Sequence, residues 1–276
     1  MRFEPTLPDD RVNVSPQHPL RDAALLVLGI SATAVAIVLV IAVSVDLLVP
    51  YIPPVAETKL FSFFDSEDDA NEDAEEDLRE KQVQKLLERL AAGWKDNPYA
   101  FRVSVLDQSE PNAFAVPGGR IVITSGLLES VSSESELVFV LGHEIGHFKQ
   151  RDHLRGLGRG LAIGLALSVL DLGGAGGAFE LLSGATGIAS RHFDRNQESG
   201  ADKIGLELVW RAYGDVSGAT NLFDHLPQPS GKIEEQFQSY LATHPVHSDR
   251  IEALNRLADE NGWRRDGVAR TLRLAH

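Results

Sequence analysis

Residues 133–150 read SESELVFVLGHEIGHFKQ. Ser133, followed three residues later by Glu136, forms a capping box ahead of an apolar run. The pattern predicts a helix that begins after Ser133 and continues through Gln150. The same helix carries the polar residues that indicate the chemistry of the chain.

Residues 143–147 of this helix are His-Glu-Ile-Gly-His, an H-E-x-x-H motif. On a helix, His143 and His147 lie about one turn apart on the same face, so two imidazoles can reach one Zn²⁺. Glu144 projects close enough to contact a water at that metal. The alternative is a pair of surface histidines, so the choice depends on the rest of the chain.

A catalytic zinc site of this kind needs a third protein ligand and leaves its fourth position for water. The candidates are His153, His192, Asp194, Glu198 and Asp202. His153 is too close to the motif for the third histidine of a metzincin, so we expect it behind the ligands or on the surface. Glu198 and Asp202 share one face of a second predicted helix, where one carboxylate can bind metal and the other can orient an imidazole. Both can equally be solvated acids.

The elements around this helix predict an α+β domain in which helices dominate. Apolar periodicity predicts a helix at residues 78–94, and alternation predicts a strand at 101–106. Two further strands, 113–116 and 120–124, are joined through Pro117, Gly118 and Gly119 as a hairpin. Further helices are expected at residues 154–170, 196–213 and 248–261.

Near the N-terminus, residues 23–45 read AALLVLGISATAVAIVLVIAVSV, without a charge. As a helix this segment is about 34 Å long, enough to cross the hydrocarbon core. The alternatives are a buried core helix and a cleaved signal peptide. We expect a polar tail (1–22), a transmembrane helix (23–49), a proline-containing acidic linker (50–77) and a zinc metallopeptidase domain (78–276).

Charge and composition exclude several classes of protein. The net charge is −14, and ten acidic residues fall between positions 65 and 80, so a nucleic-acid partner is disfavoured. The chain has no cysteine, which excludes disulfides, thiolate zinc sites and cysteine nucleophiles. Arg2, Arg11 and Arg21 precede the apolar segment and Lys59 follows it, so the N-terminus is expected in the cytoplasm and the catalytic domain outside.

Four motifs in order resemble one family. They are Asn112-Ala113-Phe114-Ala115-Val116-Pro117-Gly118-Gly119, the H-E-x-x-H, Glu198-Ser199-Gly200-Ala201-Asp202, and Thr243-His244-Pro245 followed by Arg250-Ile251. Together they look like the HtpX and CAAX-prenyl-protease family of membrane-associated gluzincin zinc metallopeptidases.

The resemblance implies a role for each matched residue. His143, His147 and Glu198 would bind one Zn²⁺, Glu144 would be the general base, and Asp202 would support a ligand. His244 would stabilise the oxyanion, and Arg250 would support His244 or the substrate. Apart from the resemblance, the free main-chain groups of Ala113, Phe114 and Ala115 would hold an extended peptide if their strand is an edge beside the cleft, or the strand is part of an ordinary structural hairpin. Asn112 would either contact the substrate or cap the end of the strand.

The chain departs from the multi-span members of that family because it shows one clear span. Residues 160–170 are apolar but too short to cross a bilayer, so a single-span form is favoured over a membrane chamber for prenylated proteins. The glycine-rich residues 171–187 are interpreted as a flexible cover over the cleft, with close helix packing or a membrane contact as alternatives.

The sequence therefore indicates a membrane-anchored zinc endopeptidase that hydrolyses unfolded or misassembled proteins, with protein substrates and the membrane as partners. A membrane-anchored binding or chaperone-like protein with a structural metal is the alternative. Glu144 favours catalysis, since a structural site has no use for a free carboxylate at an open position. An enzyme stored inactive with a covered cleft is a third possibility, and the oligomeric state is left open.

Overall fold

A computed structural model describes residues 18–61, 78–169, 194–225, 240, 243–244 and 248–274. The described elements are α1 (Pro19–Leu48), η2 (Val49–Tyr51), α2 (Pro54–Phe61), α4 (Leu78–Ala92), β1 (Arg102–Leu106), β2 (Ala113–Val116), β3 (Arg120–Thr124), α5 (Ser125–Ser130), α6 (Glu134–Gln150), α7 (Asp152–Val169), α10 (Arg195–Tyr213), α11 (Leu222–His225) and α13 (Ser248–Glu260). The predicted helix-dominated α+β class is confirmed.

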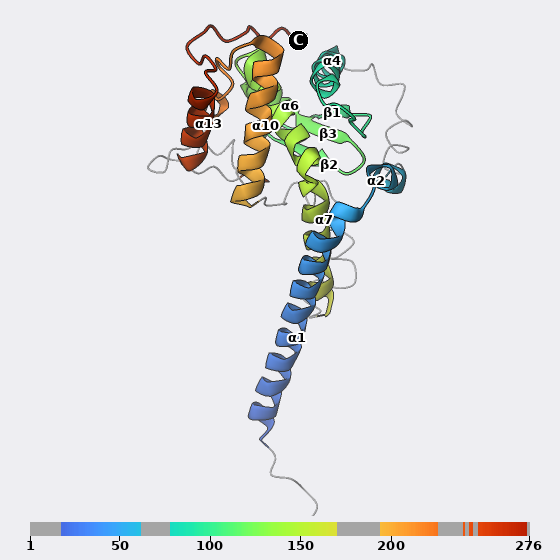
Figure 1. Cartoon of the computed structure of the whole chain (residues 1–276). Coiled ribbons are helices and arrows are strands. Elements are labelled where there is room, and N and C mark those ends of the chain that lie inside the picture. Colours follow the sequence, from blue (N-terminus) through green and yellow to red (C-terminus); the bar gives the residue numbers. More distant parts are fainter. Residues whose placement is uncertain are drawn as a thin grey trace, which may run out of the picture.

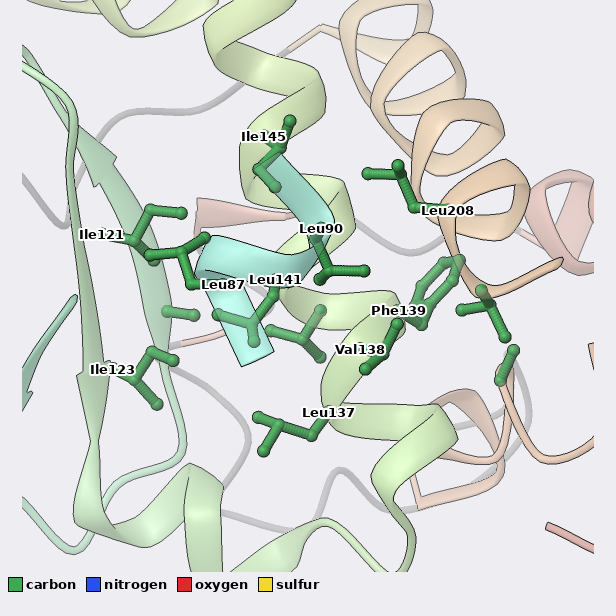
Figure 2. Packing of buried hydrophobic residues seen from close by; sticks show 14 of the residues in the cluster. Leu87, Leu90, Ile121, Ile123, Leu137, Val138, Phe139, Leu141, Ile145 and Leu208 are labelled. Atoms are coloured by element: carbon green, nitrogen blue, oxygen red, sulfur yellow. The ribbon is translucent and has the colours of Figure 1, made fainter. Parts of the chain in front are cut away.

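Helix α6 lies at the centre of the domain, between the sheet and α10 (Figure 1). Its residues from Ser135 to Phe148 are buried on every face, as expected of a core helix. Figure 2 shows apolar side chains of α4 and β3 meeting α6 on one side and Leu208 of α10 on the other. The H-E-x-x-H motif is therefore carried by the most enclosed element of the fold.

The start of α6 follows the predicted capping pattern in part. The Ser133 side chain accepts a hydrogen bond from the N–H of Glu136, as expected. The Glu136 carboxylate instead accepts from the N–H and hydroxyl of Ser132, one residue before the cap. The strands and helices predicted for residues 78–276 agree with the observed bounds to within two residues, α1 begins four residues before the predicted transmembrane helix, and η2, α2, α5 and α11 are additional.

The sheet has the strand order β1-β3-β2. The predicted hairpin is confirmed, because β2 pairs antiparallel with β3 through Gly118 and Gly119, which both have a φ of 100°. Strand β1 runs parallel to β3, and its outer edge is covered by α4, where Gln84 and Glu80 accept hydrogen bonds from its N–H groups. Strand β2 forms the other edge and lies beside α6.

Helices α6 and α10 approach closely because small residues face one another. A Cβ added to Gly146 would lie 2.7 Å from the Cα of Ala201, and one added to Gly142 would lie 3.0 Å from the Cα of Gly205. Side chains that point from one helix to the other can therefore meet over short distances.

Gly146→Ala is expected to force the two helices apart. Overpacking of this kind costs about 1–3 kcal/mol, which outweighs the gain of about 1 kcal/mol from the better helix propensity of alanine. We expect a melting temperature lower by several degrees, measured by circular dichroism. Gly160→Ala is the control, since that position has open space around it and should tolerate alanine. An unchanged melting temperature for Gly146→Ala would show that the helices can separate at no cost.

Helix α1 corresponds to the predicted apolar segment and extends beyond it at both ends. Together with η2 it is the one described helix long and apolar enough to cross a membrane, and it supports membrane association of the chain. Pro50 and Pro53 follow its end. The interval predicted as a linker, 50–77, begins with the end of η2 and continues into α2, whose Glu57 is buried in the domain. The acidic residues 65–77, the glycine-rich residues 171–187 and His192 lie outside the described residues.

Candidate metal centre

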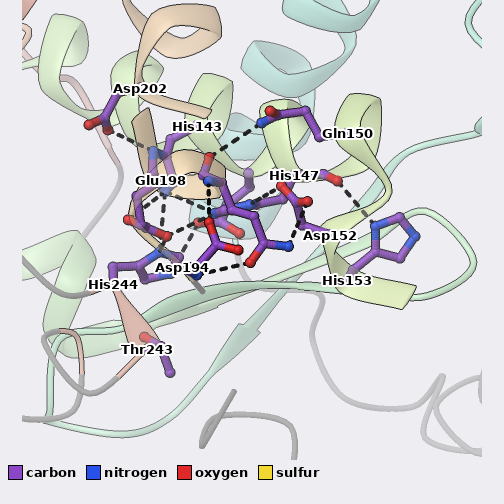
Figure 3. A network of polar contacts seen from close by, with 12 residues as sticks. His143, His147, Gln150, Asp152, His153, Asp194, Glu198, Asp202, Thr243 and His244 are labelled. Atoms are coloured by element: carbon purple, nitrogen blue, oxygen red, sulfur yellow. Dashed lines mark hydrogen bonds and ion pairs between the residues drawn. The ribbon is translucent and has the colours of Figure 1, made fainter. Parts of the chain in front are cut away.

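The structure brings four buried side chains to one point (Figure 3). His143 and His147 of α6, Glu198 of α10 and His244 each direct one ligand atom into a group in which all four atoms lie within 4.8 Å of one another. The two Nε2 atoms of His143 and His147 are 3.1 Å apart. Nδ1 of His244 lies 3.2 Å from Nε2 of His143 and 3.2 Å from Oε1 of Glu198.

Helix α10 places Glu198 because its N-terminus is firmly capped. Asp194 accepts hydrogen bonds from Asn196 and Gln197 in a complete capping box, so this candidate ligand is a helix cap instead. Glu198 then falls in the first turn, where Oε1 is 3.4 Å from Nε2 of His147 and Oε2 is 3.6 Å from Nε2 of His143. His153 is fully buried, with Nδ1 3.3 Å from the carbonyl oxygen of His147 and Nε2 2.8 Å from Glu57, so of its two expected positions it takes the one behind the ligands.

Two aspartates fix the orientation of the paired imidazoles. Nδ1 of His143 donates to Asp202 over 3.0 Å, and Nδ1 of His147 donates to Asp152 over 3.1 Å. Each ring therefore turns the lone pair of Nε2 toward the other ring. Two lone pairs 3.1 Å apart repel unless a cation or proton lies between them, so this donor set fits a metal ion.

The charges around the rings also favour a cation. Burial disfavours a charged imidazole, but the carboxylates of Asp152, Glu198 and Glu144 outweigh it and raise the pKa of His147 to about 10. Burial alone would raise the pKa of a carboxyl group, yet the imidazoles of His244 and His143 hold the pKa of Glu198 well below its usual range. The site thus prefers to hold positive charge among ionised carboxylates.

Glu144 has the position and the chemistry expected of a base. Its side chain is fully buried, and both carboxylate oxygens lack a hydrogen-bond partner within the described parts of the chain. Oε1 lies 3.6 Å from Nε2 of His244. A buried carboxylate is costly without a partner, so Glu144 is suited to accept a hydrogen bond from a water molecule or from a polar group of a substrate.

Arg250 of α13 joins the two acidic residues of α10. Its side chain is 3% exposed, Nη1 is 2.7 Å from Oε2 of Glu198, and Nη2 is 2.7 Å from Oδ1 of Asp202. The family resemblance left open whether Arg250 supports His244 or the substrate. The structure places its guanidinium group against these two carboxylates. Arg250 therefore orients both acidic residues and offsets part of their charge.

His244 also contacts the edge strand β2. Its Nε2 donates to the carbonyl oxygen of Ala113 over 3.1 Å. The carbonyl of Asn112 accepts from the N–H of Thr124 in the neighbouring strand, so by alternation Ala113 and Ala115 direct their main-chain groups away from β3. All four residues of β2 are buried, including Phe114, and Asn112 accepts from Thr243 through its side chain.

A second buried polar cluster lies behind the site and was not foreseen from the sequence. Glu57 of α2 is 1% exposed. Its Oε1 accepts from Nε2 of His153 (2.8 Å) and from the N–H of Gly118 (3.0 Å), and its Oε2 accepts from the hydroxyl of Tyr99 (2.9 Å). Arg151 lies 3.2 Å from the same carboxylate. One residue of α2 therefore ties the hairpin turn to the start of α7.

Glu57→Gln is expected to destabilise the domain. The NH₂ group of glutamine is a hydrogen-bond donor, and the groups that surround the carboxylate of Glu57 are also donors. An unpaired buried polar group costs about 1–3 kcal/mol. Burial would raise the carboxyl pKa, but His153, Gly118 and Tyr99 hold the pKa of Glu57 below its ordinary value of 4.5. The carboxylate therefore contributes its stability above pH 4.5 and loses it as the pH falls through the lowered value.

The check is the melting temperature of Glu57→Gln and of the exposed control Glu88→Gln as a function of pH. At pH 7 only Glu57→Gln should melt several degrees below the unmodified chain. This difference in melting temperature should shrink below pH 4.5. A difference in melting temperature that grows in acid would contradict the expected loss of the stability contributed by the Glu57 carboxylate at low pH.

An H-E-x-x-H helix packed against a second helix that supplies a carboxylate defines the class of metallopeptidase domains. Residues 77–258 match the model of Peptidase family M48, and the chain belongs to this family. The family resemblance of the four motifs is thereby confirmed. M48 peptidases depend on a metal, and the buried His-His-Glu-His group is suited to bind one.

Individual relatives agree with this assignment. The chain is 28% identical over 188 residues to the mitochondrial metalloendopeptidase OMA1 of Schizosaccharomyces pombe, covering 67% of this chain and 54% of the relative. It is 31% identical over 187 residues to the beta-barrel assembly-enhancing protease of Yersinia pestis, covering 63% and 38%. It is 29% identical over 171 residues to metalloendopeptidase OMA1 of Danio rerio, covering 57% and 35%. The chain thus matches about half or less of each relative's length.

Proposed function

We propose that the chain is a membrane-anchored zinc endopeptidase that hydrolyses peptide bonds of unfolded or misassembled proteins. The observation that carries this proposal is the buried carboxylate of Glu144, without a described hydrogen-bond partner and next to the converging donor atoms. A site that served only to hold the fold together would have no use for it. The printed names of the relatives, metalloendopeptidase and protease, support the same activity.

In this proposal His143, His147 and Glu198 hold the metal, and nitrogen with carboxylate oxygen is a donor set that suits Zn²⁺. When bound, the metal supplies a Lewis acid that polarises the scissile carbonyl and makes water more acidic. Asp202 and Asp152 keep Nε2 of each imidazole free for it.

Glu144 takes the proton from the attacking water and passes it to the leaving amine. His244 lies 3.6 Å from Glu144 and donates a hydrogen bond to the oxygen of the scissile carbonyl as negative charge develops there. Main-chain groups of Ala113 and Ala115 pair with an extended peptide, with Asn112 and Phe114 flanking it, and the paired strand would replace the present contact between His244 and Ala113.

The orientation proposed for the anchor has the N-terminus in the cytoplasm and the catalytic domain outside. Arg2, Arg11 and Arg21 lie before the apolar stretch of α1 and Lys59 lies after it, which supports this orientation through the positive-inside rule. The division of the chain into tail, anchor, linker and domain belongs to the same proposal.

Removal of the metal is the direct test. The full chain in detergent micelles is expected to cleave β-casein, to lose this activity after dialysis against a chelator, and to regain it with one equivalent of Zn²⁺ per chain. Fragment release is read by gel electrophoresis and metal content by elemental analysis. Cleavage that survives in metal-free protein contradicts the proposal, and a chain that binds zinc without cleaving any unfolded protein favours a structural metal.

A further inference from the structure

Helix α7 leaves the domain and runs back along α1, so that the two helices lie side by side and antiparallel (Figure 1). They touch near the upper end of the span, where a Cβ added to Gly158 would lie 2.5 Å from the side chain of Val45. From there α7 continues to Val169, away from the catalytic domain.

The face of α1 that α7 follows differs from the rest of that helix. Most of α1 is exposed, but Ser31, Ala34, Val38, Ile41 and Val45 are buried or half-buried, at alternating spacings of three and four residues, and Ala42 and Ser44 are also half-buried near the domain. This spacing forms one stripe along a helix, typical of a packed helix pair. Ala34 is 3% exposed, whereas its neighbour Val35 is 58% exposed, so the stripe is sharply bounded.

Charged residues mark where this helix pair enters the domain. Asp46 of α1 lies 3.3 Å from Arg159 and 3.7 Å from Arg155, both of α7. Beyond this cluster, residues 160–170 of the sequence, GLAIGLALSVL, carry no charge. Residues 23–45 of α1 are likewise uncharged, so both helices become wholly apolar on the same side of the charged cluster.

We propose that the second half of α7 enters the bilayer beside α1 without crossing it, with the lipid acyl chains as its partner. If α1 spans the membrane, the residues that run alongside it below Asp46 lie at the depth of the hydrocarbon. Residues 160–169 form a helix of about 15 Å, half of a hydrocarbon core of about 30 Å. An uncharged segment of this length is stable in lipid and unfavourable in water.

The consequence concerns the catalytic site, because α7 begins at Asp152, the residue that binds Nδ1 of His147. Only about 10 Å of helix separates Asp152 from Arg159 at the charged cluster. A helix pair fixed in the membrane therefore holds the candidate metal centre close to the lipid surface and at a set height. Peptide segments near that surface are the ones it can reach.

Depth in the bilayer is the test, and the absence of cysteine makes single-cysteine labelling specific. Leu167→Cys in α7, Leu39→Cys on the exposed face of α1 and Lys203→Cys on the exposed surface of α10 are labelled with the fluorophore NBD in the full chain. The proteins are reconstituted into vesicles of phosphatidylcholine and phosphatidylglycerol. Doxyl-labelled lipid should quench the NBD fluorescence at position 167 as strongly as that at position 39. Iodide should quench the fluorescence at position 167 several-fold less than that at position 203.

Pairing of the helices is tested separately with Val45→Cys/Gly158→Cys, where the two Cβ atoms would lie close to disulfide distance. Oxidation in vesicles should cross-link this pair and not the control Val35→Cys/Val45→Ala/Gly158→Cys, since Val35 is exposed on α1 and Val45→Ala leaves room beside position 158. Iodide quenching of position 167 equal to that of position 203 overturns the proposal. Lipid quenching at position 167 without the cross-link overturns it as well, because α7 would then enter the membrane away from α1.

Discussion

Glu144→Gln is expected to abolish peptide hydrolysis while the metal stays bound. Glutamine keeps the size of the side chain but has no charge and cannot accept the proton of the attacking water. Removal of a general base lowers a rate by about 10²–10⁴-fold, and the proton must also reach the leaving amine through the same group. The loss should therefore lie at the upper end of that range.

The geometry around Glu144 explains why the metal should remain. Its carboxylate is not among the four groups whose ligand atoms converge, and its Oε1 lies 3.6 Å from Nε2 of His244. Three properties of each variant are measured: its metal content by elemental analysis, its folding by thermal unfolding, and its activity by the cleavage of β-casein. Glu129→Gln, an exposed position at the end of α5, is the matched control and should retain activity. Casein cleavage by Glu144→Gln at the normal rate would remove Glu144 from the mechanism.

Glu198→Ala is expected to release the metal. Its carboxylate is 1% exposed and approaches both imidazoles and His244, so the proposed site loses its only carboxylate ligand. The substitution also leaves Arg250, which is itself buried, without one of its ion-pair partners. Because Arg250 keeps its ion pair with Asp202, the cost should stay below the about 3–5 kcal/mol of a wholly unpaired buried charge, and the variant should melt below the unmodified chain.

Glu207→Ala is the matched control, because Glu207 lies on the same helix and pairs with Arg211 at the surface. Both variants are purified in the presence of zinc and compared for metal content and for cleavage. We expect zinc in Glu207→Ala and little or none in Glu198→Ala. A full equivalent of zinc in a folded Glu198→Ala would mean that another residue supplies the third ligand, and His244 would be the first to examine.

Local patterns allowed much of the fold and part of the site to be predicted. The H-E-x-x-H motif lies within one helix, so its spacing alone places His143 and His147 on one face. The same holds for Glu198 and Asp202, whose separation of four residues predicts one face of α10. Helix ends were predictable where a capping residue such as Ser133 marks them.

Contacts between distant segments were not predictable in this way. Asp152 meets His147 because Arg151 adopts a left-handed conformation with a φ of 63° and turns the chain between α6 and α7. Glu57 was assigned to a linker because prolines precede it and an acidic stretch follows it, and only the position of His153 and Tyr99 in the fold explains its burial. The parallel pairing of β1 with β3 is likewise a property of the fold and not of either strand.

The buried charges around the imidazoles have a thermodynamic consequence. The four carboxylates of Glu144, Asp152, Glu198 and Asp202 are buried around the imidazoles, and the guanidinium groups of Arg155 and Arg250 pair with the last three of them. With neutral imidazoles this leaves an excess of two negative charges, which one divalent ion neutralises. Without that ion the enclosed group must take up protons or admit water. Loading of the ion and completion of folding thus form one equilibrium, in which each drives the other.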